Sequence, residues 1–238
     1  MSFYVYCLCD ELPDTLDASA GIGGAQVRAL WCNEIAAVVS EFAGDAVKIT
    51  REHVLAHERV VGRVLTQVTP LPFRFGTVTS EARLRGYIET NAAALRAQLA
   101  RVRGCVEMSV KVLGPREAGA NEAAQAELDA PKLARSATGT GTAFLEAKRR
   151  ALVGDETAQA QAEEVARWLT SQVADVVRAG QLSVRPARGL LIAAAHLVER
   201  VRLAEYRARV RRACAGRNEL HFLTSGPWPP YSFSQENP

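Results

Sequence analysis

Cysteines and histidines in the first quarter of the chain have spacings that could support metal chemistry. Cys7 and Cys9 would share one face of a strand and, with Cys32, could form a soft-metal site. Metal sites usually place paired cysteines on turns, and cysteine is a common core residue, so we expect core packing. His53 and His57 lie four residues apart on a predicted helix and could reach one ion, but HVLAHE lacks the glutamate placement of the zinc-protease motifs. We therefore expect His57 to be a buried, hydrogen-bonded core residue.

The remaining patterns do not mark a catalytic site. Gly21, Gly23 and Gly24 match neither a P-loop nor a dinucleotide-binding motif, and no helix start follows them. The sequence contains no nucleophile-elbow pattern and no pair of carboxylates marked as acid and base. The residues therefore form no catalytic constellation, and we expect no catalytic residue, no metal and no cofactor. The remaining enzymatic alternative would use Cys7, Cys9 and the His53/His57 pair with a metal.

The most basic segment is a predicted helix at 199–215. Its arginines are Arg200, Arg202, Arg207, Arg209, Arg211 and Arg212. A basic helix could bind nucleic acid or an anionic membrane surface. These arginines are interleaved with Glu199 and Glu205, and the formal net charge is only +3, which favours a solvated face. Nucleic-acid binding by tandem ferredoxin-like domains through this helix is the alternative function, although we do not expect nucleic acid as a partner.

One aromatic segment lies at 70–78, in a chain whose aromatic content is only 6%. The alternation predicts that Phe73 and Phe75 face one side of a strand and Arg74 the other. An ordinary core strand with one polar-face arginine would have the same pattern. We hypothesise that the three residues contribute either to domain closure or to contact with a partner.

A second aromatic segment, at 226–233, contains three prolines that would hold it extended. Its aromatic side chains can then lie across a domain surface with little loss of entropy. The segment would act either as a strap that closes the second domain or as an aromatic contact surface for a partner. The hypothesised partner-binding residues are Phe73, Arg74, Phe75, Trp228, Tyr231 and Phe233.

The elements predicted for the first half alternate between strand and helix periods. They are strands at 3–9, 25–31 and 35–42, a helix at 50–68, a strand at 71–79, a helix at 80–102 and a strand at 106–113. Pro70 and Pro72 would end the first helix and Gly104 the second. This order indicates an N-terminal α+β domain over 1–114, with a modified ferredoxin-like antiparallel sheet covered on one face by two helices.

The second half is predicted as a separate α+β unit over 141–238. Residues 115–140, rich in Ala, Gly, Glu and Thr, read as a linker with a marginal helix at 118–130. Apolar positions at helical spacing from Ala162 to Val177 predict a long helix that could begin as early as Phe144. Strands at 182–185 and 190–197, a helix at 199–215 and a strand at 219–224 would complete an α-β-β-α-β order.

The composition is typical of a soluble globular protein, with 48% hydrophobic and 23% charged residues. Five cysteines without regular spacing do not describe a disulfide framework. The N-terminal apolar run is too short for a signal peptide, and the longest later run, at 190–198, is too short to span a membrane. We therefore expect a cytoplasmic protein with reduced thiols and no membrane span.

Several peptides together resemble the gas vesicle accessory family GvpL/GvpF. The matching segments are the strand at 4–6, the helix with His57 followed by 70–78 (the family's H…PLRFGT core), the strand at 106–112 (E…VKV), the helix start at 141–149 (G.AYL..R) and the ending at 223–233 (TGPWPPYSF). The resemblance covers nearly the whole chain, and the last motif is the most specific.

The resemblance implies a two-domain α+β protein without an enzymatic role. Members are accessory or minor structural proteins of gas vesicle assembly, thought to bind the small, very hydrophobic shell protein and to support nucleation of the shell. The implied partners are the gas vesicle shell protein and other gas vesicle accessory proteins, in the cytoplasm and at the gas vesicle. A protein that handles an aggregation-prone subunit needs apolar surface rimmed by charge.

Overall fold

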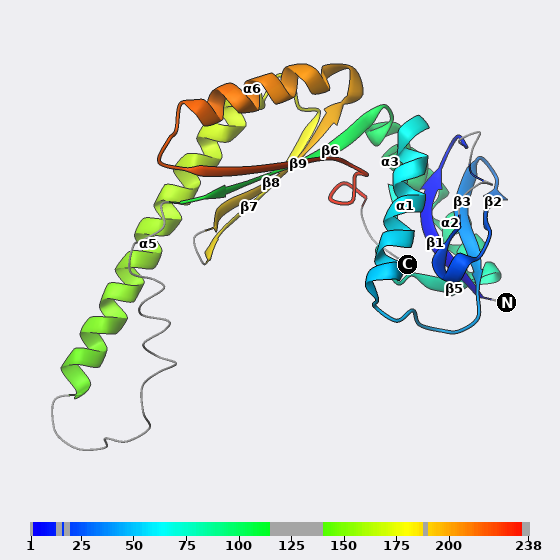
Figure 1. Ribbon diagram of the computed structural model, residues 1–238, viewed down its shortest axis with the longest axis horizontal. Helices are drawn as coiled ribbons and strands as arrows, with labels where there is room; N and C mark the ends of the chain where they lie inside the picture. The colour runs from blue at the N-terminus through cyan, green and yellow to red at the C-terminus, as the bar shows by residue number, and fades with distance from the viewer. Residues whose placement is uncertain (1, 13–15, 17–19, 115–139, 188–189, 235–238) are drawn as a thin grey trace.

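The chain folds around two antiparallel sheets, each with its own helices, arranged one beyond the other along the long axis (Figure 1). The computed structural model describes residues 2–12, 16, 20–114, 140–187 and 190–234, and the side chains of these residues except 140–156 and 185–187. The predicted α+β class with two sheets is confirmed. Within these residues, none of the helices is both long and apolar enough to cross a membrane.

The first sheet has the strand order β2-β3-β1-β4, and β5 also pairs with β1. Its strands are β1 (Ser2–Cys9), β2 (Val27–Cys32), β3 (Ile35–Phe42), β4 (Leu71–Pro72) and β5 (Val78–Ser80). Strand β1 is apolar on both faces, because Phe3 and Val5 belong to one buried cluster and Tyr4 and Tyr6 to another. Both faces of this sheet therefore need a covering layer.

Three helices supply those layers: α1 (Arg51–Gln67), α2 (Glu81–Thr90) and α3 (Ala92–Val102). Val60 and Val64 of α1 pack on the Tyr4 side, whereas Leu84 of α2 and Leu99 of α3 pack on the Phe3 side. The expectation that helices cover only one face is wrong. The single predicted helix at 80–102 is also interrupted, at Asn91, whose side-chain amide donates to the carbonyl of Tyr87 (2.8 Å).

The predicted strand at 71–79 forms only at its two ends, as β4 and β5. Pro72 has no amide hydrogen to donate, and Gly76 has a φ of 94°, so the segment between them turns instead of pairing. Phe73 and Phe75 consequently pack in different clusters, on the two sides of the first sheet. The expectation that they face the same side is therefore wrong.

The second sheet has the order β7-β8-β6-β9. Its strands are β6 (Cys105–Leu113), β7 (Ala179–Ala187), β8 (Leu190–Glu199) and β9 (His221–Trp228). Strand β6 was expected in the N-terminal sheet but pairs with β8 and β9. Gly104, with a φ of 71°, makes the turn from α3 into this strand. The predicted boundary at 114 stays a prediction; because β6 pairs with strands of the second sheet, we propose that the units divide near Gly104.

Two helices, α5 (Thr140–Val173) and α6 (Leu203–Ala215), cover one face of the second sheet. Leu169 of α5 and Val210 of α6 pack against Val110 and Ile192 of the sheet. Helix α5 extends beyond the sheet toward its N-terminus (Figure 1). The predicted α-β-β-α-β order is observed, whereas the predicted linker and marginal helix at 118–130 lie outside the described residues.

Candidate functional site

The C-terminal aromatic segment lies at the junction of the two units. Residues 229–234, here called the C-terminal strap, follow β9 and cross from the second sheet to α1 and α3. Phe233 is 2% exposed and packs in the cluster that contains Leu95 and Leu99 of α3. The carbonyl of Phe233 accepts a hydrogen bond from Arg101 (2.9 Å). The strap therefore fastens the end of the second sheet to the first unit.

A buried glutamate holds the middle of the strap. The carboxylate of Glu107 on β6 accepts from both the amide and the hydroxyl of Ser232, each at 2.8 Å. Burial raises the pKa of Glu107, and the two hydrogen bonds from Ser232 oppose that shift. Because both carboxylate oxygens have donors, the acid serves as an anchor for the strap backbone.

A hydrogen-bond chain through His57 joins the strap to the first sheet. The Tyr4 hydroxyl lies 2.8 Å from Nδ1 of His57, and the Tyr231 hydroxyl lies 3.0 Å from Nε2. The Tyr231 hydroxyl donates to Glu58 (3.1 Å), so it must accept from the Nε2–H of His57. Nδ1 is then the acceptor for the Tyr4 hydroxyl, whose oxygen accepts the amide hydrogen of Gly76 (3.1 Å). One tautomer of a neutral His57 thus satisfies every group in the chain.

Burial keeps the central groups of this chain neutral. Desolvation lowers the pKa of His57 to about 4, because the imidazolium form cannot be hydrated there. Desolvation also raises the pKa of Tyr4 and of Tyr231, and the nearby Glu58 adds to both shifts. The arrangement therefore acts as a structural joint at neutral pH, with its only carboxylate, Glu58, at the partly exposed end.

Arg200, directly after β8, makes a second connection between the units. Its guanidinium donates to the carbonyl of Leu65 at the end of α1 and approaches the carbonyl of Val68 (3.4 Å). The hydroxyl of Thr69 in turn donates to the carbonyl of Cys105 (2.9 Å). The C-terminal end of α1 is therefore bound to both β6 and the turn after β8.

A groove of about 460 Å³ opens between α1 and the end of β9. Its walls include Leu65 of α1, Val106 of β6, and Pro227 and Trp228 of β9, and its charged lining residues include Glu58. Trp228 is 46% exposed, and its indole nitrogen donates to the hydroxyl of Ser225 (3.2 Å). The junction therefore presents an aromatic side chain beside an apolar groove with a charged rim.

The six hypothesised partner-binding residues separate by exposure. Phe73 and Phe233 are buried in the core, and Tyr231 is engaged in the His57 chain, so these three side chains make intramolecular contacts. Phe75 is half-buried and packs at the side of Tyr4 and His57. The side chains of Arg74 and Trp228, the remaining two of the six, are exposed to solvent. A partner contact by any of the six stays a prediction.

The residues considered for a metal do not converge. Cys7 and Cys9 are buried with their sulfurs 4.0 Å apart, whereas Cys32 packs in the cluster on the other side of the sheet. His53 bonds to the carbonyl of Lys48 (2.9 Å), and both ring nitrogens of His57 have tyrosine partners. In the part of the chain that the structure describes, no group of three His, Cys, Asp or Glu side chains could hold an ion.

The sequence did not predict the hydrogen bonds that join the two units, namely those of His57 with Tyr4 and Tyr231 and those of Glu107 with Ser232. A tyrosine in a fully apolar strand needs a buried hydrogen-bond partner, and Tyr4 is such a residue. Glu107 is likewise a buried acid, and the only acid in β6, which signals a specific partner. These signals indicate that each residue has a hydrogen-bond partner. They do not identify His57 as the partner of Tyr4 or Ser232 as the partner of Glu107, because each partner is more than fifty residues away in the sequence.

The sequence is similar to a known protein family and to several of its members. The sequence profile described as gas vesicle synthesis protein GvpL/GvpF matches residues 2–235. Gas vesicle protein F1 of Halobacterium salinarum is 27% identical, with 98% of this chain and 92% of the relative covered. Gas vesicle protein L of a Streptomyces species is 29% identical, with 97% and 92% covered.

Two solved structures share the fold. The crystal structure of GvpF from an Anabaena species has a TM-score of 0.78 at 17% identity and covers 99% of this chain and 97% of that one. GvpF from Microcystis aeruginosa has a TM-score of 0.75 at 18% identity, with 99% of both chains covered. The family profile spans almost every residue, and the chain therefore belongs to the GvpL/GvpF family of gas vesicle synthesis proteins.

Proposed function

We propose that this protein supports gas vesicle assembly by binding the hydrophobic shell protein at the junction groove, so that shell subunits are held for nucleation. The role is that of an accessory or minor structural protein and is not enzymatic. Its partners are the shell protein and other gas vesicle accessory proteins, and its place of action is the cytoplasm and the nascent vesicle.

The observation that carries the proposal is the exposure of Trp228 beside the apolar groove. An exposed tryptophan at the edge of an apolar depression is a common anchor of protein interfaces, because a large side chain can bury area at little cost in conformational entropy. Glu58 and Arg200 line the same groove, so its apolar wall has charged neighbours. This combination suits a partner that is apolar but must be kept from aggregating.

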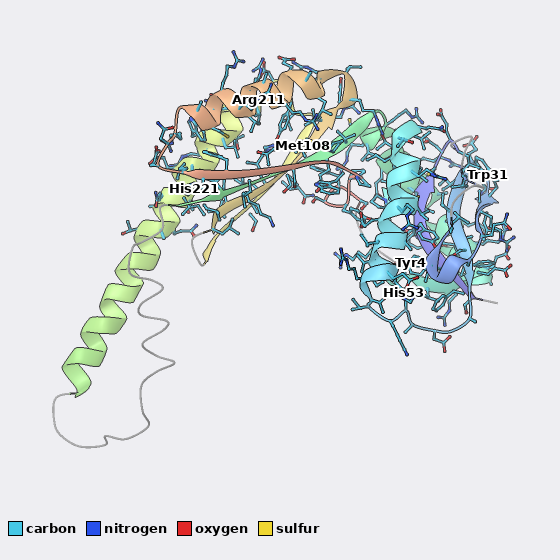
Figure 2. The ribbon with its side chains drawn as sticks, viewed as in Figure 1. Tyr4, Trp31, His53, Met108, Arg211 and His221 are labelled. Carbon is cyan, nitrogen blue, oxygen red and sulfur yellow. The ribbon has the colours of Figure 1, made fainter. Side chains whose placement is uncertain are left out.

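The experiment is co-expression with a gas vesicle shell protein, followed by pull-down of the tagged chain. Trp228→Ala should reduce capture of the shell protein by about ten-fold, the loss typical of an interface anchor. Trp31→Ala is the matched control, because Trp31 on β2 is also 46% exposed and lies on the side of the first unit that faces away from the second sheet (Figure 2). Circular dichroism and thermal unfolding would verify that both variants are folded.

The two variants discriminate between surfaces. Unchanged capture by a folded Trp228→Ala protein would show that the groove is not the contact. Loss of capture only in Trp31→Ala would place the contact on the first sheet. The alternative function, nucleic-acid binding, can be tested on the same protein. It predicts that the protein binds RNA or DNA and that this binding weakens strongly as the salt concentration rises.

A further inference from the structure

Strand β9 is the edge of the second sheet, and its outer side has no strand partner among the described residues. It pairs with β6 on its inner side, in regular register from His221 to Ser225. An edge strand presents an unpaired row of backbone donors and acceptors, which another extended segment can use. The side chains of 221–225 carry no carboxylate or Arg/Lys charge, so β9 itself would not repel a charged segment.

Helix α6 places arginines along this edge. Arg207 donates to the carbonyl of Gly226 on β9 (3.3 Å), which fixes the flank of α6 that faces the strand. Arg211 lies one helical turn farther on the same flank, because residues four apart share a helix face. In the view of Figures 1 and 2, α6 lies above β9 and runs in the opposite direction. Arg211, in the second half of the helix, therefore lies toward the same end of the sheet as His221, where β9 begins.

These arginines differ from those on the other flank of α6. Arg202 and Arg209 both bond to Asp175 after α5 and to Glu205. Within the described part of the chain, by contrast, no carboxylate lies within ion-pair distance of Arg207 or Arg211. Arg202 and Arg209 are therefore paired toward α5, whereas Arg207 and Arg211 add uncompensated charge on the flank toward β9.

Leu223 gives the other face of the same edge an apolar character. It lies opposite Lys111 of β6, on the sheet face away from the helices, and is 57% exposed. A strand added outside β9 would point alternate side chains to the two faces of the sheet. Those on the helix face would approach Arg207 and Arg211, and those on the open face would lie beside Leu223.

We propose that β9 binds, by strand addition, an extended segment of a partner protein in which acidic and apolar residues alternate. The acidic side chains pair with Arg207 and Arg211, the apolar ones cover Leu223, and the backbone completes the sheet. This surface is separate from the junction groove, so the proposal does not rest on shell-protein binding.

Two other occupants fit less well. A second copy of the chain would pair β9 with β9 about a two-fold axis, which brings the unpaired arginines of both copies to the same face. Like charges directly opposite destabilise such a pairing. Nucleic acid would use the arginines but not the backbone row or Leu223.

The test measures binding of a fluorescein-labelled peptide of about ten residues, a length that spans an average strand, with alternating Glu and Val. Fluorescence anisotropy with the full chain at about 50 mM NaCl keeps electrostatic contributions large. Arg207→Gln with Arg211→Gln should weaken binding at least about ten-fold, as expected for loss of two charge-assisted contacts. The matched control is Arg51→Gln with Arg83→Gln, two exposed arginines of the first unit.

The peptide series isolates each element of the proposal. A Lys–Val peptide should not bind, a peptide with Glu and Val in separate blocks should bind weakly, and N-methylation at alternate residues should abolish strand pairing. Equal binding of the alternating and block peptides, or no effect of the Arg207/Arg211 change, would overturn the proposal. Complete absence of peptide binding would also overturn it and leave the arginines as protection of the edge. Displacement of the peptide by oligouridine at equal concentration would favour nucleic acid instead.

Discussion

Replacement of Tyr231 by phenylalanine tests whether the His57 chain holds the two units together. The variant removes one hydroxyl that accepts from the Nε2–H of His57 and donates to Glu58. His57 is 1% exposed, so its donor cannot find water without a local opening of the strap. A buried donor left without a partner costs about 1–3 kcal/mol. Glu58 is only half-buried and can be rehydrated, so we expect a loss of about 2 kcal/mol in the free energy of unfolding.

The assay is equilibrium urea unfolding followed by circular dichroism, in which a fall in midpoint at constant m-value reports lost stability. Glu58→Ala is the companion variant, since it removes only the partly exposed end of the chain. It should cost less than about 1 kcal/mol, as expected for a solvent-accessible hydrogen bond. If Tyr231→Phe costs no more than about 0.5 kcal/mol, which is within the range of ordinary surface changes, the hydrogen-bond chain does not fasten the strap.

Three further outcomes follow from buried groups. The pKa values of His57 and His196 are lowered to about 4 from 6.5, so the unfolded state binds more protons between these values. Stability should therefore be complete above pH 6.5 and fall by up to about 3 kcal/mol per histidine as the pH drops to 4, measured by urea unfolding across that range. Phe233→Ala should cost about 3–5 kcal/mol by the same measurement, because it empties a core site; a loss below about 1 kcal/mol would contradict the buried placement. Gly226→Ala should lower the melting temperature, because Gly226 has a φ of 116° and a Cβ would lie 2.8 Å from the carbonyl oxygen of Glu107; an unchanged melting temperature would refute that geometry.

Periodicity predicts which elements exist, and it does so well for this chain. The strand at 3–9, the hairpin of β2 and β3, and the helices α1 and α6 were all expected close to their observed bounds. Each has a strong local signal, such as the aromatic and β-branched residues of β1 or the Thr50 hydroxyl that accepts from the amide of His53 at the start of α1.

Periodicity does not decide which sheet a strand joins. Strand β6 alternates apolar and polar residues, and it follows α3 through a short turn at Gly104, so pairing with β1 and pairing with β8 give the same local pattern. The choice depends on the complementary faces of β8 and β9, the first of which begins 77 residues after the end of β6 (Leu113 to Leu190). The same non-local dependence hid Ser232 as the partner of Glu107 and Tyr231 as a partner of His57, since Ser232 and Tyr231 lie in the strap.

The C-terminal residues 221–234 combine three contacts that can be separated experimentally. Strand β9 offers a free edge beside Arg207, Trp228 lines the junction groove, and the strap is bound to the first unit through Tyr231. The three prolines of 227–230 keep these parts at fixed spacing, so that their functions do not require a common motion. Weakening the strap at Tyr231 should then lower stability and disturb the groove, yet leave the binding of an acidic peptide to β9 intact. A parallel loss of peptide binding would mean that the edge of the second sheet depends on the joint between the units, and that the two surfaces act as one.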